Sequence, residues 1–158
     1  MTDDATSVLL SKIAIQELVQ ENALVLDNED LSRWLEMFDE SLEYRLSAYS
    51  SELRREVVWW QSDRLALEKL VKEIPQHVRD PARRCHLVCP SQVNVTGEVA
   101  FATSRFAIFR TLPEGDTHFY VAGRYEDSFV NKSERWLYRS HHVVVETRQL
   151  DAFTHLPL

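Results

Sequence analysis

FYVAGRYED, residues 119–127, reads as the centre of a long β-strand with a glycine in its middle. It belongs to one of four long strand segments, joined by short turns, that fill the second half of the chain. They span about residues 83–96, 98–111, 117–130 and 134–147. Because strands usually have about five or six residues, strands of this length must bend strongly to stay packed. Gly123 offers a natural bending point, and Pro90 predicts a bulge or a sheet edge within the first segment.

The first half of the chain is acidic and mostly helical in pattern. We expect three helices, because apolar side chains recur at the helical spacing. They cover about residues 7–26, 30–38 and 63–74. Residues 41–49 alternate between apolar and polar side chains, which predicts a half-buried strand, whereas the polar residues 50–56 predict a loop. The order of elements predicts one α+β domain over residues 1–158, with the helices packed in the concave side of a curved antiparallel sheet.

Charge and composition exclude several classes of partner. The 158 residues carry a formal net charge of −7. Nucleic acids and anionic membranes both require clustered positive charge, so the sequence predicts that the chain binds neither nucleic acid nor membrane. No apolar run approaches the ~20 residues of a membrane-spanning helix, and the N-terminus lacks the basic start and apolar centre of a signal peptide. We therefore expect a cytoplasmic protein.

The spacing of cysteines and histidines argues against a metal site. Cys85 and Cys89 lie four residues apart in a predicted strand, so their Cα atoms are about 13 Å apart. That distance is too long for a disulfide or for chelation of one ion, and predicts two reduced, half-buried thiols. His141 and His142 are neighbours in another strand and point to opposite faces, whereas a two-histidine, one-carboxylate iron site needs them to converge. We expect no metal in this chain.

The interior of a curved sheet could instead hold an acid–base pocket. The candidates for such a pocket are Tyr44, His86, Tyr120 and His142, with Glu126 or Asp127. Proton abstraction or dehydration needs a carboxylate–histidine or tyrosine–histidine pair within hydrogen-bond reach. The sequence supplies these residue types, but no spacing that forces them together. The alternative is that the tyrosines pack with their hydroxyls at a rim and the carboxylates form surface ion pairs.

Five apolar residues are candidates for an interface with a partner. Trp59 and Trp60 are neighbours in an extended segment, so they cannot both enter one core face. One of them is a candidate anchor, since tryptophan is enriched at interface hot spots; the alternative is that both are buried beneath the preceding loop. Phe153, Leu156 and Leu158 in the tail also need burial, either on this chain or on a neighbour.

Several short motifs, taken in order along the chain, resemble a known family. They are Trp34-Leu35 with Phe38, Tyr44-Arg45, Asp63-Arg64 with Leu67, Asp80-Pro81-Ala82-Arg83 before His86-Leu87-Val88, Gly123-Arg124-Tyr125-Glu126-Asp127, Trp136 and Val143-Val144-Val145-Glu146. Over nearly its whole length the chain resembles the small (β) subunit of bacterial aromatic-ring-hydroxylating dioxygenases. These proteins have the cystatin-like cone fold of the broader nuclear-transport-factor-2-like group.

The resemblance implies a structural subunit of an oxidoreductase in the breakdown of aromatic compounds, with no catalytic or cofactor-binding residue of its own. In such enzymes the large (α) subunit carries a Rieske 2Fe-2S cluster and a mononuclear iron, and three copies of each subunit form an α3β3 assembly. Two other functions stay open from the residues alone. One is a stand-alone isomerase or dehydratase of the same fold, acting on a small hydrophobic carbonyl compound. The other is a ligand-binding or assembly protein without turnover.

Overall fold

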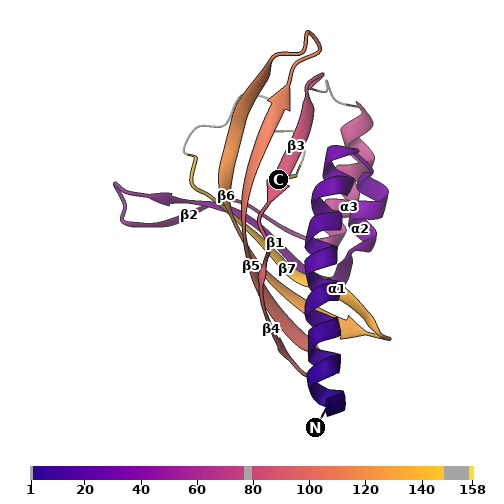
Figure 1. The fold of residues 1–158 in the computed structure, drawn as a ribbon. Helices are drawn as coiled ribbons and strands as arrows, with labels where there is room; N and C mark the ends of the chain where they lie inside the picture. Colours follow the sequence, from indigo (N-terminus) through magenta and orange to yellow (C-terminus); the bar gives the residue numbers. More distant parts are fainter. Residues whose placement is uncertain (1, 77–79, 148–156) are drawn as a thin grey trace.

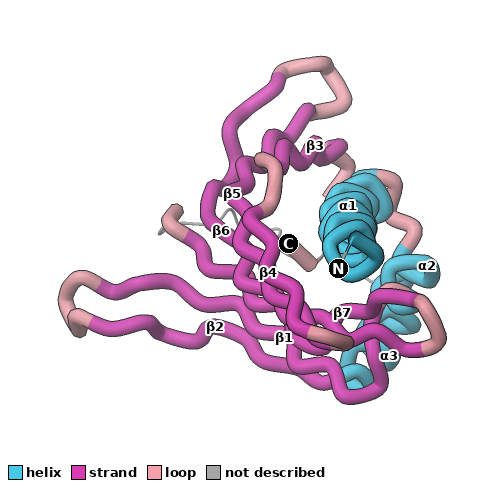
Figure 2. Tube along the Cα trace, turned by 60° about the horizontal axis from the view of Figure 1, so that its bottom comes forward, coloured by secondary structure: helices cyan, strands magenta, loops and turns pink. Residues whose placement is uncertain are grey.

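The computed structural model describes residues 2–76, 80–147 and 157–158. Its elements follow in the order α1 (Thr2–Asp27), α2 (Leu31–Glu36), β1 (Phe38–Ser50), β2 (Arg55–Asp63), α3 (Arg64–Glu73), a 3₁₀ turn (Ile74–Gln76), β3 (Arg83–Val88), β4 (Gln92–Thr96), β5 (Val99–Thr111), β6 (Thr117–Lys132) and β7 (Arg135–Val145). The strands form one curved sheet, and α1, α2 and α3 lie on one side of it (Figures 1 and 2). The predicted α+β architecture, with helices against a curved sheet, is confirmed.

The sheet joins the beginning and the end of the chain. Its order is β2-β1-β7-β6-β5-β3, and β4 also pairs with β5. The last strands form the predicted antiparallel meander, but β1 pairs with β7 in parallel. The pairing shifts by one residue between Leu46 and Ser47, between Ile108 and Phe109, and between Ser128 and Phe129. Such bulges increase local twist, which allows strands of 13 and 16 residues to bend around the helices.

Two elements differ from the sequence prediction. Residues 55–63 form the edge strand β2, whereas we expected a loop through residue 56 and assigned no strand to the extended segment around Trp59 and Trp60. The strand exists because it completes a hairpin with β1, a long-range pairing that local patterns do not report. The segment 83–96 is two strands, because the chain leaves the β5 ladder around Pro90 and returns to it at Gln92. Pro90 therefore lies between two separate strands and does not form a bulge within one long strand.

The core lies between α1 and the concave face of the sheet. Ile15, Val19 and Leu26 on α1 are buried there, as the helical pattern predicted. Around Trp34 the core is aromatic: its ring packs edge-on against Phe38, and its indole N–H donates to Asn22 Oδ1 at 2.8 Å. In the described part of the chain, no helix is long and apolar enough to cross a membrane.

Candidate functional site

The centre of the core contains a buried histidine–carboxylate pair. Asp127 on β6 lies opposite His141 on β7 in the sheet register, and His141 Nδ1 is 2.6 Å from Asp127 Oδ1. Neither side chain is exposed to solvent. Three tyrosine rings surround the imidazole, with centroids 5.6 Å (Tyr44), 5.0 Å (Tyr125) and 5.1 Å (Tyr138) from it. The sheet thus brings together an acid–base pair that sequence spacing alone could not position.

Burial controls the protonation of this cluster. It raises the pKa of Asp127, an effect that the neighbouring His141 partly offsets. It also raises the pKa values of Tyr125 and Tyr138, so both hydroxyls stay protonated at neutral pH. Among the described residues, four buried atoms of the cluster have no hydrogen-bond partner: His141 Nε2, Asp127 Oδ2 and the two tyrosine hydroxyls. The cluster has the residue types of an acid–base centre, but packed rings enclose it.

A second histidine–carboxylate pair joins the end of α1 to β3. His86 Nδ1 lies 2.5 Å from Asp27 Oδ1, and the backbone N–H of His86 donates to Asp27 Oδ2 at 2.9 Å. The His86 side chain is buried, as a pocket candidate should be. Because Asp27 is the last residue of α1, these bonds fix the helix end against the sheet.

The two tyrosine pocket candidates, Tyr44 and Tyr120, are linked to residues 157–158, Tyr44 directly and Tyr120 through Arg84. Tyr44 is fully buried; its hydroxyl donates to Leu158 O and accepts from Leu158 N–H, both at 3.3 Å. Burial raises the pKa of Tyr44, so it remains a donor. Arg84 donates to Pro157 O at 3.1 Å and lies over the ring of buried Tyr120. These two pocket candidates therefore hold the chain's own residues.

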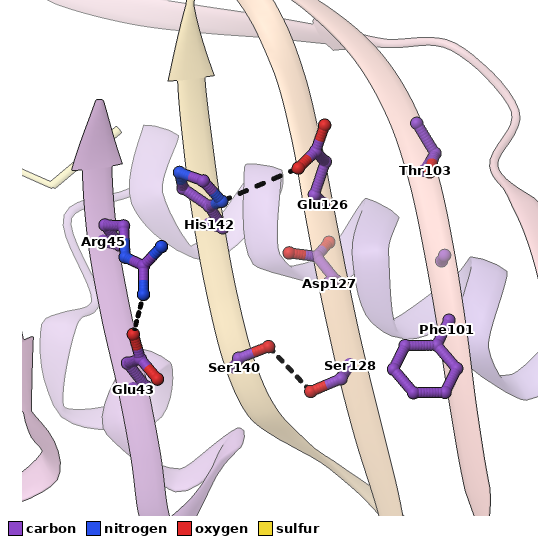
Figure 3. A pocket seen from close by; sticks show the side chains of 10 residues that line it. Glu43, Arg45, Phe101, Thr103, Glu126, Asp127, Ser128, Ser140 and His142 are labelled. Atoms are coloured by element: carbon purple, nitrogen blue, oxygen red, sulfur yellow. Dashed lines mark hydrogen bonds and ion pairs between the residues drawn. The ribbon is translucent and has the colours of Figure 1, made fainter. Parts of the chain in front are cut away.

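His142, the remaining pocket candidate, lies on the opposite face of the sheet. It lines a hollow of about 430 Å³ on the outer face (Figure 3). There its Nε2 is 2.7 Å from Ser47 Oγ and 3.0 Å from Glu56 Oε1, while Nδ1 is 3.7 Å from Glu126 Oε2. The hollow is also lined by Glu43, Arg45, Phe101, Thr103, Ser128 and Ser140, and by parts of Ala102 and Asp127, two residues that are almost fully buried.

The inward histidine is therefore His141, and His142 as an interior candidate was wrong. Side chains alternate along β7, so residues 141, 143 and 145 share the buried face. In the sequence, the apolar residues Val143 and Val145 already indicate which face of β7 is buried. Likewise Asp127, and not Glu126, faces inward.

The two cysteines are free, as expected, but both are exposed and not half-buried. On β3 the inward position belongs to His86, which places Cys85 on the outer face. In the described ranges, no group of three or more histidine, cysteine or carboxylate side chains is arranged to hold a metal ion.

The interface candidates have different surroundings. Trp60 packs on Tyr44, with ring centroids 4.9 Å apart, whereas Trp59 is 43% exposed. The two tryptophans thus divide between core and surface. Leu158 is only 1% exposed and is buried by this chain itself. Phe153 and Leu156 lie outside the described residues.

Curated relatives of this chain are small subunits of oxygenases. It is 27% identical to the β subunit of 2-aminobenzenesulfonate 2,3-dioxygenase from Alcaligenes sp., over 94% of this chain and all of the relative. It is 24% identical to the hydroxylase β subunit of methanesulfonate monooxygenase from Methylosulfonomonas methylovora, over 92% of this chain and 86% of the relative.

A solved structure has the same fold. It is the provisionally assigned β subunit of an aromatic-ring-hydroxylating dioxygenase from Novosphingobium aromaticivorans, with a TM-score of 0.84 at 21% identity. The match covers 95% of this chain and 98% of that one. The sequence model of the SnoaL-like domain matches residues 7–142, which is most of the chain. The chain belongs to the family of SnoaL-like domain proteins.

Proposed function

We propose that this chain is the small subunit of a multicomponent ring-hydroxylating oxygenase. The observation that carries the proposal is the end-to-end match to small subunits of such enzymes, which spans the whole length of the aminobenzenesulfonate dioxygenase relative. The partner is then a larger Rieske-type subunit that holds the 2Fe-2S cluster and the mononuclear iron. This chain contributes to turnover indirectly, by supporting that subunit.

The enclosure of the interior supports a structural role. A stand-alone isomerase or dehydratase would need His141 or a tyrosine hydroxyl to reach a substrate carbon or oxygen. Here the imidazole lies among three tyrosine rings, and Tyr44 is bonded to the backbone of Leu158. The distance requirement for an acid–base pair is met, but none of these groups is exposed. Such a core suits a scaffold better than a pocket enzyme.

The proposed assembly contains three copies of each subunit, and it acts on an aromatic compound in the cytoplasm. A three-fold assembly gives each small subunit two kinds of neighbour, the large subunit and further copies of itself. The apolar side chains that stay exposed on this chain, Trp59 among them, are then interface residues. The identity of the arene depends on the large subunit.

Affinity purification of the tagged chain from its native cells tests the proposal. We expect a larger protein to copurify in equal molar amount. The complex should show the visible absorption of a Rieske cluster and contain mononuclear iron as well. The purified small subunit alone should lack that absorption. Recovery of the chain without any larger iron–sulfur protein, or turnover of a small carbonyl compound by the chain alone, would contradict the proposal.

A further inference from the structure

A hairpin arm projects sideways from the sheet. The arm consists of residues 49–59, at the end of β1 and the start of β2, and extends beyond the other strands (Figures 1 and 2). Its large apolar side chains are exposed, namely Tyr49, Leu53, Val58 and Trp59. Leu46 pairs with Trp60 and Ser47 with Val58, so Trp59 is the extra residue of a β-bulge. Without a cross-strand neighbour, its indole is available for a partner.

On the other side of the molecule, α1 has a second apolar stripe. Leu9, Ile13 and Leu24 are exposed and recur at helical spacing, on the side of α1 away from buried Ile15 and Val19. Ile13 and Leu24 line a hollow of about 490 Å³ between α1 and the β3–β4 connection. The hollow is also lined by Gln16, Glu17, Gln20, Glu21, Pro90 and Ser91. A helix that is apolar on two sides usually has a packing partner on both.

Two arginines of the arm and one glutamate of the hollow carry opposite charges. Arg54 and Arg55 lie at the tip of the arm, and Glu17 lines the hollow. All three side chains are exposed, and within residues 2–76, 80–147 and 157–158 none of them forms an ion pair inside the chain. Arg54 has a φ of 49°, a left-handed conformation that a non-glycine residue adopts at some cost. The turn thus places Arg54 next to Arg55, the first residue of β2, in a segment that also contains Glu52.

The two features lie on opposite sides of the molecule, so an arm cannot reach the hollow of its own chain (Figures 1 and 2). We propose that copies of this chain associate head to tail, with the arm of one copy seated in the α1 hollow of the next. Trp59 fills the apolar hollow, while Arg54 or Arg55 pairs with Glu17. A contact between two different patches is heterologous, and it closes into a ring when the rotation between neighbouring copies divides a full turn. In the proposed assembly, three small subunits meet in a ring through this contact. The number three rests on the proposed function, whereas the contact itself rests on the arm and the hollow.

Sedimentation velocity of the isolated full-length chain, over a concentration series, tests the contact. We expect a trimer that dissociates on dilution. Trp59→Glu and Leu24→Glu should each raise the dissociation constant by at least about 30-fold, the effect typical of removing a buried hot-spot residue. Leu65→Glu is the control, because Leu65 is an exposed leucine on α3 outside both features, and it should leave the trimer unchanged. Far-ultraviolet circular dichroism checks that each variant is folded.

Two mixing experiments separate this contact from other modes of association. Trp59→Glu retains an intact hollow and Leu24→Glu an intact arm, so a one-to-one mixture should form a dimer that neither variant forms alone. A symmetric contact between identical patches predicts no such rescue. Likewise, Glu17→Arg should weaken the trimer, and combining it with Arg54→Glu and Arg55→Glu should restore it, because the charges are then exchanged.

A chain that stays monomeric at all concentrations, or a trimer that survives both Trp59→Glu and Leu24→Glu, would overturn the inference. So would a Trp59→Glu variant that trimerises normally but fails to bind the large subunit, because the arm would then serve that subunit. These results leave the proposed function intact if the chain still copurifies with a Rieske protein. Conversely, a trimer with the predicted variant effects but no such partner would retain the contact and remove the proposed function.

Discussion

His141 Nδ1 lies 2.6 Å from Asp127 Oδ1, with both side chains fully buried at the centre of the core. The two residues face each other across β6 and β7 and therefore link the strands through their side chains as well as their backbones. A buried pair of this kind tolerates loss of one partner poorly, because the remaining polar group is left without compensation.

We predict that Asp127→Ala lowers the free energy of unfolding by about 3–5 kcal/mol, the usual cost of breaking a buried pair. Asp127→Asn should cost less, since its amide oxygen can still accept from His141 Nδ1–H. Urea denaturation followed by circular dichroism measures both values. Equal losses for the two variants would contradict the role of the hydrogen bond.

The same pair predicts a dependence on pH. Burial raises the pKa of Asp127 in the folded protein above the 3.8 of an unperturbed aspartate. The folded state then binds more protons at this group than the unfolded chain, so its contribution is fully present below 3.8 and is lost as pH rises through the raised folded value. The stability of wild type relative to Asp127→Asn should therefore fall with rising pH above about 4. A rising difference would contradict the direction of the shift.

The elements that were predicted well are those that depend on local pattern. The α1 core positions follow helical spacing, and β5, β6 and β7 follow from long alternating runs bounded by turns. The hairpin strand β2 was missed because its exposed side chains show no regular alternation, and pairing with β1 is what holds it. Local propensity carries little information about an edge strand with both faces largely solvated.

Some contacts of the site join residues that are far apart in the sequence, so sequence spacing does not predict them. Asp27 and His86 are 59 residues apart, and their contact requires α1 to end beside β3. His141 differs in this respect, because Val143 and Val145 lie on the same face of β7 and indicate which of the two histidines points inward. The choice between His141 and His142 was therefore decidable, whereas the Asp27–His86 pair was not.

A surface-to-core ion pair predicts acid sensitivity. Asp39 is buried and lies 2.5 Å from Lys132 Nζ. Burial alone would raise the pKa of Asp39, but hydrogen bonds from Lys132 and Ser41 outweigh it and lower the pKa to about 2. Its stabilising contribution is present above the unperturbed value of 3.8 and is lost as pH falls towards 2. Lys132→Met should cost about 1–2 kcal/mol at pH 7 and almost nothing at pH 2.

Lys132→Arg is the control for that experiment, because it keeps a cation within reach of Asp39 and should cost less than Lys132→Met. Thermal unfolding of the three proteins at several pH values measures the effect. A loss for Lys132→Met that is the same at pH 2 and pH 7 would show that packing of the side chain, and not the charge, is responsible.

Gly123 tests the close approach of β6 and β7. A Cβ atom at this position would lie 2.2 Å from Val144 O and 3.1 Å from the ring of Phe106. Because one neighbour is backbone, the strands must separate to admit a methyl group. Gly123→Ala should therefore destabilise the fold by about 1–3 kcal/mol, as overpacking does.

Gly97→Asn provides a matched control for that substitution. Gly97 has open space around its Cα and a φ of 61°, a conformation that asparagine tolerates. Its free energy of unfolding should change by less than about 0.5 kcal/mol. A Gly123→Ala variant as stable as Gly97→Asn in urea would mean that β6 and β7 are not in such close contact.

The last prediction concerns the hydroxyl of Tyr44, which both donates to and accepts from the backbone of Leu158. Tyr44→Phe keeps the buried ring but leaves the N–H and C=O of Leu158 without this partner. Since Leu158 is 1% exposed, water cannot replace the lost bonds without opening the core. We expect a loss of about 1–2 kcal/mol in urea denaturation, and faster exchange of the Leu158 amide hydrogen. Tyr49→Phe removes an exposed hydroxyl and should change neither quantity. If Tyr44→Phe leaves the amide exchange of Leu158 unchanged, the tail is held by apolar packing and not by Tyr44.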